Sequence, residues 1–494
     1  MLSFIRFRIV ISPLVKHNLR RMTPQVQQIT TEVIKNPLAC IVQPNDFPLQ
    51  SKTYEFCQEY MSLPSQQRIE MLKELAVKYE FDRDATRKAA ESYLTSHDKG
   101  TASQLKAADR LKSTLSPNYA YAFNRIRKID GGVKFLVDLR EDLLKFLPSL
   151  DYNDDATHHL KGLNNYLKEI LSFSFNIGFL NVERITWDSS CNMLEKISLY
   201  EAVHPIRNWT DIKQRVGPYR RCYIFTHNSM PKEPIVVLHT ALTNEISSCV
   251  KPFVRQDRKH LNDKVISQSK CEKEDPNNIQ AAIFYSITST QKGLHGIELG
   301  NQLIKKAVQE VLSEFPHVSK FSSLSPIPGF RDWLLLEIRK LKNGTSIITS
   351  FFSEQDIQNV RSIISNVTSS EVWNALNVAI ASNKWIVNEQ LREALQLPLM
   401  KTCAHYLYKE KRRNNALNSV AHFHLRNGAV LWRLNWEADL SPRGLDNSCG
   451  MMVNYRYYLE DTEINSKQYM EDHYISISDD IKSLLNPPYN KSSL

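Results

Sequence analysis

The spacing of apolar residues divides the chain into a helical first part and a mixed second part. From Pro24 to about Gly178, apolar residues recur at steps of three and four, the pattern of amphipathic helices. Ser65 and Asp155 each stand where such a helix would begin. We find no catalytic constellation here and interpret the region as a helical bundle for packing or oligomer contact. Three of its apolar stripes are Ile69, Leu72, Leu75, Ala76 and Tyr79; Val133, Leu136, Leu139, Leu143, Phe146 and Leu147; and Leu160, Leu163, Leu167, Ile170 and Leu171.

After Gly178, short β-rich runs alternate with helical segments. Helices are expected from Ser189 to about Tyr200, from Gly296 to about Phe315, and again from Arg331. Residues 342–418 are interpreted as a helical insertion, and residues 251–280 as a long polar surface loop. The whole is α+β: an all-α bundle followed by a mostly antiparallel sheet crossed by a few helices. The expected strands are 182–187, 221–226, 235–242, 281–287, 320–324, 429–439 and 451–459.

One unit combines a strand, a glycine loop and a helix. A buried strand from Ala281 is followed by Gly293, Gly296 and Gly300, the last inside the next helix. A helix start with close backbone approach can bind phosphate, and Lys292 adds a positive charge. An equally open interpretation is that the glycines serve only a tight turn and a close helix–strand contact. The segment Gln291–Gly296 resembles the acyl-CoA pyrophosphate loop of the GNAT acyltransferase fold.

Two stretches place polar side chains where an element meets a loop. Ser325 precedes two prolines and a glycine that fix the backbone, although serine at a proline turn often only bonds the backbone. His422 and His424 lie in an alternating run, where both side chains would point the same way on a strand. Histidine is suited to moving protons near neutral pH, but it is also often structural. No carboxylate stands at metal-ligand spacing with the pair, so we predict no metal.

Composition places the chain among ordinary globular proteins. It has 494 residues, with 42% apolar and 23% charged residues, and no apolar run reaches the ~18 residues of a membrane helix. Its eight cysteines include no CxxC pair, which argues against a zinc site or disulfide scaffold and for a reducing compartment. Basic residues are mostly dispersed, so nucleic acid is the partner we rank last despite a pI near 9.0.

Both termini of the chain resemble targeting signals. Residues 1–22 hold Arg6, Arg8, Lys16, Arg20 and Arg21 and no acid, which accounts for half of the net charge of +10. Apolar residues interleave with these charges, as in a mitochondrial transit peptide, and a basic tail is the alternative. The final tripeptide Ser492-Ser493-Leu494 differs by one residue from the peroxisomal Ser-Lys-Leu signal, which an import receptor would bind.

Longer strings resemble the malonyl-CoA decarboxylase family. They are HPIRNWTDIKQRVGPYRRCY from His204, IELG from Ile297, SSLSPIPGF from Ser322, HFHLRNGAVLWRLNW from His422 and SCGMMVNYRYYLE from Ser448. The resemblance runs from about residue 180 to 460. It implies a carboxy-lyase of fatty acid metabolism that converts malonyl-CoA to acetyl-CoA and CO2 without metal or organic cofactor. It also implies a GNAT-fold catalytic domain at residues 178–494 and a helical domain at 23–177 that forms a homo-oligomer, taken as a tetramer.

The resemblance also carries residue roles. The family's catalytic serine and histidine fall on Ser325 and His424, and its CoA-binding segment falls on His295–Asn301. That segment consists of His295, Gly296, Ile297, Glu298, Leu299, Gly300 and Asn301. Ser325 would bond the malonyl carboxylate and take part in proton transfer, and His424 would donate a proton to the α-carbon. Asn427, Tyr455 and Tyr457 are further candidate donors. The implied location is the mitochondrial matrix, with peroxisome and cytosol as other compartments used by the family.

Two other functions remain open at this point. A GNAT-type acyltransferase would pass an acyl group from CoA to an amine, since fold does not fix function. It needs an acceptor site and a general base, and we see no clear acidic base near the glycine loop. A non-catalytic CoA-binding scaffold would bind CoA without turnover.

Overall fold

The structure is a computed structural model that describes residues 37–42, 50–151, 153–254, 274–341, 345–364 and 371–485. The chain forms two compact units, which we describe separately. The first consists of residues up to Leu180 with His227–Pro231 and Gln291–Ile297, and the second of Asn181–Thr226, Lys232–Thr290 and Glu298–Leu494. The expected transit peptide at residues 1–22 and the tripeptide Ser492-Ser493-Leu494 lie outside the described residues.

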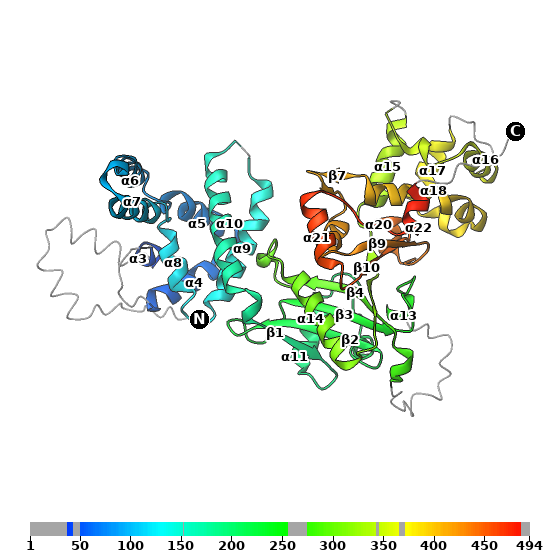
Figure 1. Ribbon diagram of the computed structural model, residues 1–494, viewed down its shortest axis with the longest axis horizontal. Coiled ribbons are helices and arrows are strands. Elements are labelled where there is room, and N and C mark those ends of the chain that lie inside the picture. Colours follow the sequence, from blue (N-terminus) through cyan, green and yellow to red (C-terminus); the bar gives the residue numbers. More distant parts are fainter. Residues whose placement is uncertain are drawn as a thin grey trace, which may run out of the picture. The chain divides into compact units, whose positions relative to one another are not determined.

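The first unit is built from helices, as its periodicity predicts. The long helices α9 and α10 lie side by side in Figure 1, and α5 packs against both. The predicted apolar faces are inside: Leu136, Leu163 and Leu167 are fully buried. Ser65 is the first residue of α5, and Asp154 rather than Asp155 caps α10 by accepting from the Ala156 N–H. The helices are α3 (Pro37–Ile41), α4 (Gln50–Ser62), α5 (Ser65–Lys78), α6 (Arg83–Leu94), α7 (Thr101–Thr114), α8 (Tyr119–Ile126), α9 (Gly132–Phe146) and α10 (Asp155–Ser174).

The second unit is built on an eight-stranded sheet of order β1-β2-β3-β4-β5-β10-β6, with β9 also paired to β10. The pairs β2–β3 and β3–β4 and the pairs of β10 with β5, β6 and β9 are antiparallel. Strands β4 and β5 are parallel, because α14 carries the chain from one to the other. The strands are β1 (Leu180–Ile185), β2 (Arg220–His227), β3 (Val236–Thr243), β4 (Ala281–Ser289), β5 (Lys320–Ser323), β6 (Ser325–Pro326), β9 (Val430–Asn435) and β10 (Met452–Tyr457); β7 (Lys411–Arg412) and β8 (Asn415–Ala416) pair separately.

Helices accompany this sheet, and those of the predicted insertion are present as α16, α17 and α18. Helix α14 packs on β3 and β4 (Figure 1). Its buried residues Leu303, Ala307 and Val311 recur every four positions and form the apolar face that this packing requires. The helices are α11 (Cys191–Tyr200), α12 (Trp209–Arg215), α13 (Lys251–Val254), α14 (Leu299–Glu314), α15 (Phe330–Lys340), α16 (Glu354–Ile363), α17 (Val372–Ala381), α18 (Glu389–Tyr408), α19 (Ser419–Arg426), α20 (Pro442–Ser448), α21 (Thr462–Glu471) and α22 (Asp479–Leu485).

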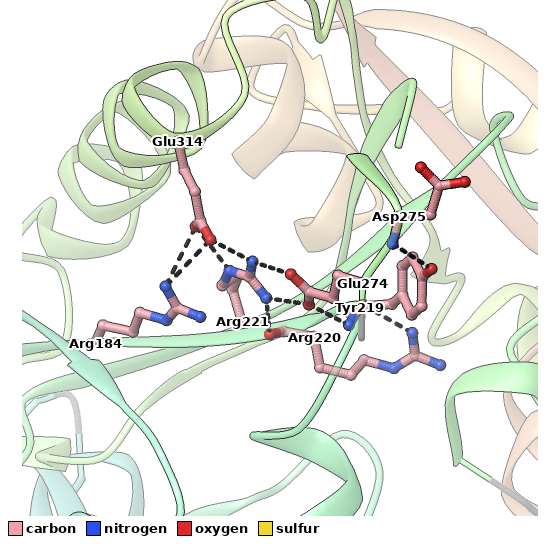
Figure 2. A network of polar contacts seen from close by, with 7 residues as sticks. All are labelled: Arg184, Tyr219, Arg220, Arg221, Glu274, Asp275 and Glu314. Atoms are coloured by element: carbon pink, nitrogen blue, oxygen red, sulfur yellow. Dashed lines mark hydrogen bonds and ion pairs between the residues drawn. The ribbon is translucent and has the colours of Figure 1, made fainter. Parts of the chain in front are cut away.

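A buried arginine ties three distant segments of the second unit together (Figure 2). The Arg221 side chain on β2 is 1% exposed and donates to both carboxylate oxygens of Glu274, each at 2.8 Å. It also donates through Nε to Glu314, at the last turn of α14, at 2.9 Å. Arg184 on β1 reaches the same Glu314 carboxylate from a more exposed position. The network therefore fixes the C-terminal end of α14 and the segment before β4 against the sheet.

Replacing Arg221 by Met should destabilise this unit by roughly 3 kcal/mol, since two partly buried carboxylates lose their main cation. Arg184→Met is the matched control, because its ion pair is exposed and should contribute less than about 1 kcal/mol. All seven tryptophans lie beyond residue 180, so urea unfolding followed by tryptophan fluorescence reports on this unit. Equal losses in the two variants would show that burial does not set the strength of the network.

Candidate active site

Strand β10 gathers the first part of the candidate site. It pairs with β5 on one stretch and with β6 on another, so that Ser322 stands opposite Arg456 and Ser325 opposite Val453. Tyr455 and Tyr457, two residues apart on β10, therefore lie on one face of the sheet. Ser325 on β6 is 5% exposed, and Ser323 just before it is 1% exposed. The sheet holds two buried serine hydroxyls beside two buried phenols.

Helix α19 supplies the histidine. The prediction that His422 and His424 share one face of a strand is wrong, because both belong to the eight-residue helix α19. Residues two apart on a helix point in different directions. His424 is buried and turns toward β10, whereas His422 is half-buried and its Nδ1 lies 2.9 Å from the Tyr469 hydroxyl. Only His424 is brought to a serine.

A chain of hydrogen bonds runs through His424. Its Nε2 lies 2.9 Å from Ser325 Oγ, and its Nδ1 lies 2.7 Å from the Tyr457 hydroxyl. The Ser325 hydroxyl donates to Ser323 Oγ at 2.8 Å. With that direction, His424 carries its hydrogen on Nε2 and donates to Ser325, while Tyr457 donates to Nδ1. The Tyr455 ring stacks on the imidazole at 4.6 Å between centroids.

Burial controls the charge states in this chain. Desolvation lowers the pKa of His424 to about 3, because the imidazolium form would lose its hydration without gaining a carboxylate partner. Burial raises the pKa of Tyr457 and that of Tyr455 above their ordinary values. The imidazole and both phenols are therefore uncharged near neutral pH. The arrangement is a buried, neutral serine–histidine–tyrosine relay that is suited to moving one proton.

Asn418 connects the serine and the histidine, and sequence analysis missed it. Its side-chain oxygen caps α19 by accepting from the Ala421 N–H at 2.9 Å. Its amide nitrogen donates to the carbonyl of Pro328 at 2.8 Å, in the turn that follows Ser325. One side chain thus sets both the start of the histidine helix and the proline turn. An asparagine just before Ser419 was a cap signal that could have revealed this helix.

Some polar groups near the pair have no partner among the protein atoms described. The Tyr455 hydroxyl and both amide atoms of Asn427 are buried and make no hydrogen bond. Buried polar atoms are usually bonded, so these two side chains are available to a ligand. The third candidate donor, Tyr457, bonds His424. Ser322, on β5, bonds the backbone carbonyl of Tyr455. The described residues include no group of three or more metal-ligating side chains.

The predicted CoA-binding segment is divided by the boundary between the units. His295, Gly296 and Ile297 belong to the helical unit, and Glu298 to Asn301 begin α14 in the other. In the helical unit, buried Arg140 of α9 donates to the carbonyls of Gly293 and His295. A Cβ at Gly293 would come within 1.8 Å of the Val137 carbonyl oxygen. Close packing against α9 therefore explains why the residue at position 293 is glycine.

The first turn of α14 is linked to the histidine helix. Glu298, at its N-cap position, makes no side-chain cap and instead pairs with Arg426 of α19 at 2.9 Å. A Cβ at Gly300 would lie 3.3 Å from both Ile287 and Phe423, the neighbour of His424. Gly300 thus allows α14 to approach β4 and α19 closely. The first backbone N–H groups of a helix have no acceptor within the helix, and the positive end of its dipole favours an anion there.

Replacing Asn418 by Ala should lower the free energy of unfolding by about 2 to 3 kcal/mol, the sum of a lost cap and a lost buried hydrogen bond. Asn208→Ala provides the matched control. That asparagine caps α12 through the Asp211 N–H alone and should cost about 1 kcal/mol. Urea unfolding followed by tryptophan fluorescence measures both. If the two variants lose the same stability, the bond to Pro328 adds nothing.

Acid should weaken the fold through His424. The pKa of this imidazole is about 3 in the folded chain and about 6.5 in an unfolded one, so the unfolded state binds the extra proton between these values. The unfolding free energy of the wild type should therefore fall by roughly 1.4 kcal/mol per pH unit more than that of His424→Asn, as pH drops from 6 to 4. Parallel curves for wild type and His424→Asn would contradict a neutral buried imidazole.

Comparison with known proteins identifies the family. The profile of the malonyl-CoA decarboxylase C-terminal domain matches residues 178–494, and that of the N-terminal domain matches residues 79–175. A mitochondrial malonyl-CoA decarboxylase of Mus musculus is 46% identical over 452 residues, covering 90% of this chain and 88% of the relative. The mitochondrial malonyl-CoA decarboxylase of Anser anser anser is 42% identical over 452 residues. This alignment covers 90% of this chain and 86% of the relative.

Solved structures agree with the sequence relatives. The crystal structure of malonyl-CoA decarboxylase from Rhodopseudomonas palustris superposes with a TM-score of 0.74 at 27% identity, covering 92% of this chain and 99% of that one. The enzyme from Agrobacterium vitis gives 0.73 at 29% identity, covering 88% and 95%. These matches confirm the predicted α+β class. The helices described are all too short or too polar to cross a membrane. This chain belongs to the malonyl-CoA decarboxylase family, a family of carboxy-lyases.

Proposed function

We propose that this member of the family converts malonyl-CoA to acetyl-CoA and CO2, with Ser325 and His424 acting on the substrate and no metal taking part. The observation that carries the proposal is the 2.9 Å contact between Ser325 Oγ and His424 Nε2 inside a dry pocket. The pair consists of the two residues to which the family resemblance assigns the chemistry. Tyr455, whose ring stacks on His424, and Asn427, which follows α19, have buried polar atoms without a partner among the described residues.

The steps of the reaction determine which groups the active site must provide. The bond between the α-carbon and the carboxylate carbon breaks, CO2 leaves, and the electron pair remains as an enolate of the thioester. The enolate then takes one proton at the α-carbon to give acetyl-CoA. A dry pocket favours neutral CO2 over the hydrated carboxylate. Fixed donors at the enolate oxygen are worth about 3 kcal/mol each where they have been measured. Asn427 and Tyr455 are the donors that remain available for this oxygen.

Ser325 binds the malonyl carboxylate in this proposal. Its hydroxyl exchanges the bond to Ser323 for a bond to the substrate, so that no donor is left unpaired in either state. The proline turn that follows, held through Pro328 by Asn418, keeps the hydroxyl in place. Binding at a fixed hydroxyl orients the breaking bond and supplies part of the rate through positioning.

His424 delivers the proton. The free imidazole is neutral with its hydrogen on Nε2, but a carboxylate bound at Ser325 places a negative charge beside that hydrogen. This charge raises the pKa of the ring and favours uptake of a second proton at Nδ1, relayed from solvent through the Tyr457 hydroxyl. When CO2 leaves, the negative charge moves to the enolate, and the imidazolium donates to its α-carbon. Tyr457 donates to Nδ1 of the neutral ring and accepts from Nδ1–H of the charged ring, and it therefore holds the ring orientation in both states. Each turnover thus consumes one proton, as the overall reaction requires.

The CoA moiety binds along His295–Asn301 in this proposal. The first turn of α14 offers backbone N–H groups and the positive end of its dipole to the phosphates. In the helical unit, the Lys168 ammonium lies near the backbone of Gly296. Contacts so far from the reacting carbon fix the pose of the thioester.

The remaining assignments concern assembly and location. We assign residues 1–22 to a transit peptide, 23–177 to a helical domain that forms a homo-oligomer, taken as a tetramer, and 178–494 to the catalytic domain. The relatives' mitochondrial location supports the matrix as the site of action, with peroxisomal import through the last three residues as a second route. Exposed Leu94, Leu105 and Leu115 on or beside α6 and α7 are apolar groups that oligomer contacts would cover.

CO2 release from carboxyl-labelled malonyl-CoA, without any amine acceptor, tests the activity and the pair together. Ser325→Ala and His424→Asn should each lower kcat by roughly 10²-fold or more. His424→Asn should leave KM nearly unchanged, whereas Ser325→Ala should also raise KM, because Ser325 binds the carboxylate of the bound substrate. His422→Asn is the matched control: that histidine sits two residues away, also bonds a tyrosine, and should keep kcat within about threefold.

The outcomes separate the competing functions. Release that collapses only in the first two variants supports the decarboxylase and its pair. Full activity in His424→Asn removes that residue from the chemistry. An absence of release in the wild type, with CoA still bound, points to an acyltransferase that needs an amine acceptor, or to a CoA-binding scaffold.

A further inference from the structure

A second cavity lies on the opposite face of the sheet from Ser325 and His424. Side chains of neighbouring residues on β4 point to opposite faces: Phe284 packs against Tyr457, whereas Tyr285 packs against Phe253. Tyr285 and Phe253 share a buried cluster with Val250 and Ala438. These last two line a cavity of about 520 Å³, within the range of small-molecule sites. The cavity is thus separated from the serine–histidine pair by the sheet itself.

The walls of this cavity are mostly apolar. Val203, Pro205, Val250, Ala438, Leu440 and Pro442 contribute the apolar surface. His204 belongs to the wall as well, and its buried Nε2 makes no hydrogen bond within the described parts of the chain. A pocket of this kind suits a ligand with an aliphatic body and one polar end.

The charges on the wall favour an anion. Three carboxylates line it, but Asp211 is paired with Arg215 at 3.0 Å and Glu437 with Arg392 at 3.5 Å, both cations outside the lining. Three cations line it too, but Lys251 has a partner of its own, which leaves Arg207 and Arg443. Arg443 donates to the backbone carbonyls of Ala202 and Val203, which leaves its charge uncompensated. Asp439 alone remains against them, so the cavity has an excess of positive charge.

We propose that this cavity is a second ligand site, which binds an aliphatic carboxylate with its chain against the apolar wall and its head group near Arg207 and Arg443. A monoanion suits the site better than a dianion such as a phosphate ester, because Asp439 would repel additional negative charge. A guanidinium matches a carboxylate in shape as well as charge. The site is distinct from the one that binds malonyl-CoA.

Cys249 provides a probe at the site. It lines the cavity and is half-buried, whereas Cys191, at the start of α11, is exposed and lies outside the lining. The full-length protein is treated with N-ethylmaleimide, with and without decanoate, and modification of each cysteine is followed by mass spectrometry. Saturating decanoate should slow alkylation of Cys249 about fivefold or more, because the ligand occupies the space the reagent must enter, and should leave Cys191 unchanged. An equal rate at Cys249 with and without decanoate overturns the proposal.

Two further arms test the head group and the independence of the site. Decanol, with the same chain and no charge, should protect Cys249 only at about tenfold higher concentration. Arg207→Met should weaken protection by decanoate about fivefold, whereas Lys213→Met, which removes a cation outside the cavity, should not. Equal protection by decanol contradicts carboxylate recognition. Protection of Cys249 by acetyl-CoA as strong as that by decanoate would assign the cavity to the substrate site and overturn the proposal. Both variants should retain wild-type CO2 release, which shows that they are folded.

Discussion

The structure of the catalytic unit depends on keeping one imidazole dry and fully bonded. His424 is only 3% exposed, and Ser325 and Tyr457 satisfy both of its nitrogens at 2.9 and 2.7 Å. An unbonded nitrogen at this depth would cost the fold several kcal/mol. A charged one would cost more, which is why the pKa falls to about 3. The same dryness that makes the ring neutral in the free protein makes it responsive to the charge of a bound carboxylate.

Several elements far apart in the sequence cooperate to hold that ring. Strand β10 carries Tyr455 and Tyr457 and pairs with the short strand that bears Ser325. Helix α19 carries His424 and begins at Asn418, whose amide also binds the proline turn. Helix α14 is fixed at its end by Arg221 and at its start by the ion pair of Glu298 with Arg426. The geometry of the pair is therefore a property of the whole sheet and its helices.

Much of this arrangement could be predicted from the sequence, and the failures have physical causes. The helical bundle, the strand–loop–helix unit and the insertion follow from strong periodicity over long segments. Helix α19 was missed because Ala421 to Arg426 alternates apolar and polar residues as a strand would, and eight residues are too few to show a helical period. The capping by Asn418 and the left-handed Gly428 after the helix decide its structure instead.

The glycine loop shows a second limit of sequence reasoning. The sequence left open whether its glycines serve phosphate binding or close packing. Gly293 packs on the backbone of Val137, and Gly300 packs on Ile287 and Phe423. No pattern within the loop could reveal these packing partners, because Val137 and Phe423 both lie more than a hundred residues away in the sequence. The partners of Asn418 and Arg140 were hidden for the same reason.

The measurement that tests the account most directly is a crystal structure of the protein with an unreactive malonyl-CoA analogue in which a sulfonate replaces the leaving carboxylate. We expect the sulfonate to accept a hydrogen bond from Ser325, with His424 Nε2 about 3 to 3.5 Å from the α-carbon, the distance of a reactive approach. The thioester oxygen should face Asn427 or the Tyr455 hydroxyl. A complex in which the α-carbon lies beyond reach of His424, or the sulfonate turns away from Ser325, would contradict the proposed mechanism.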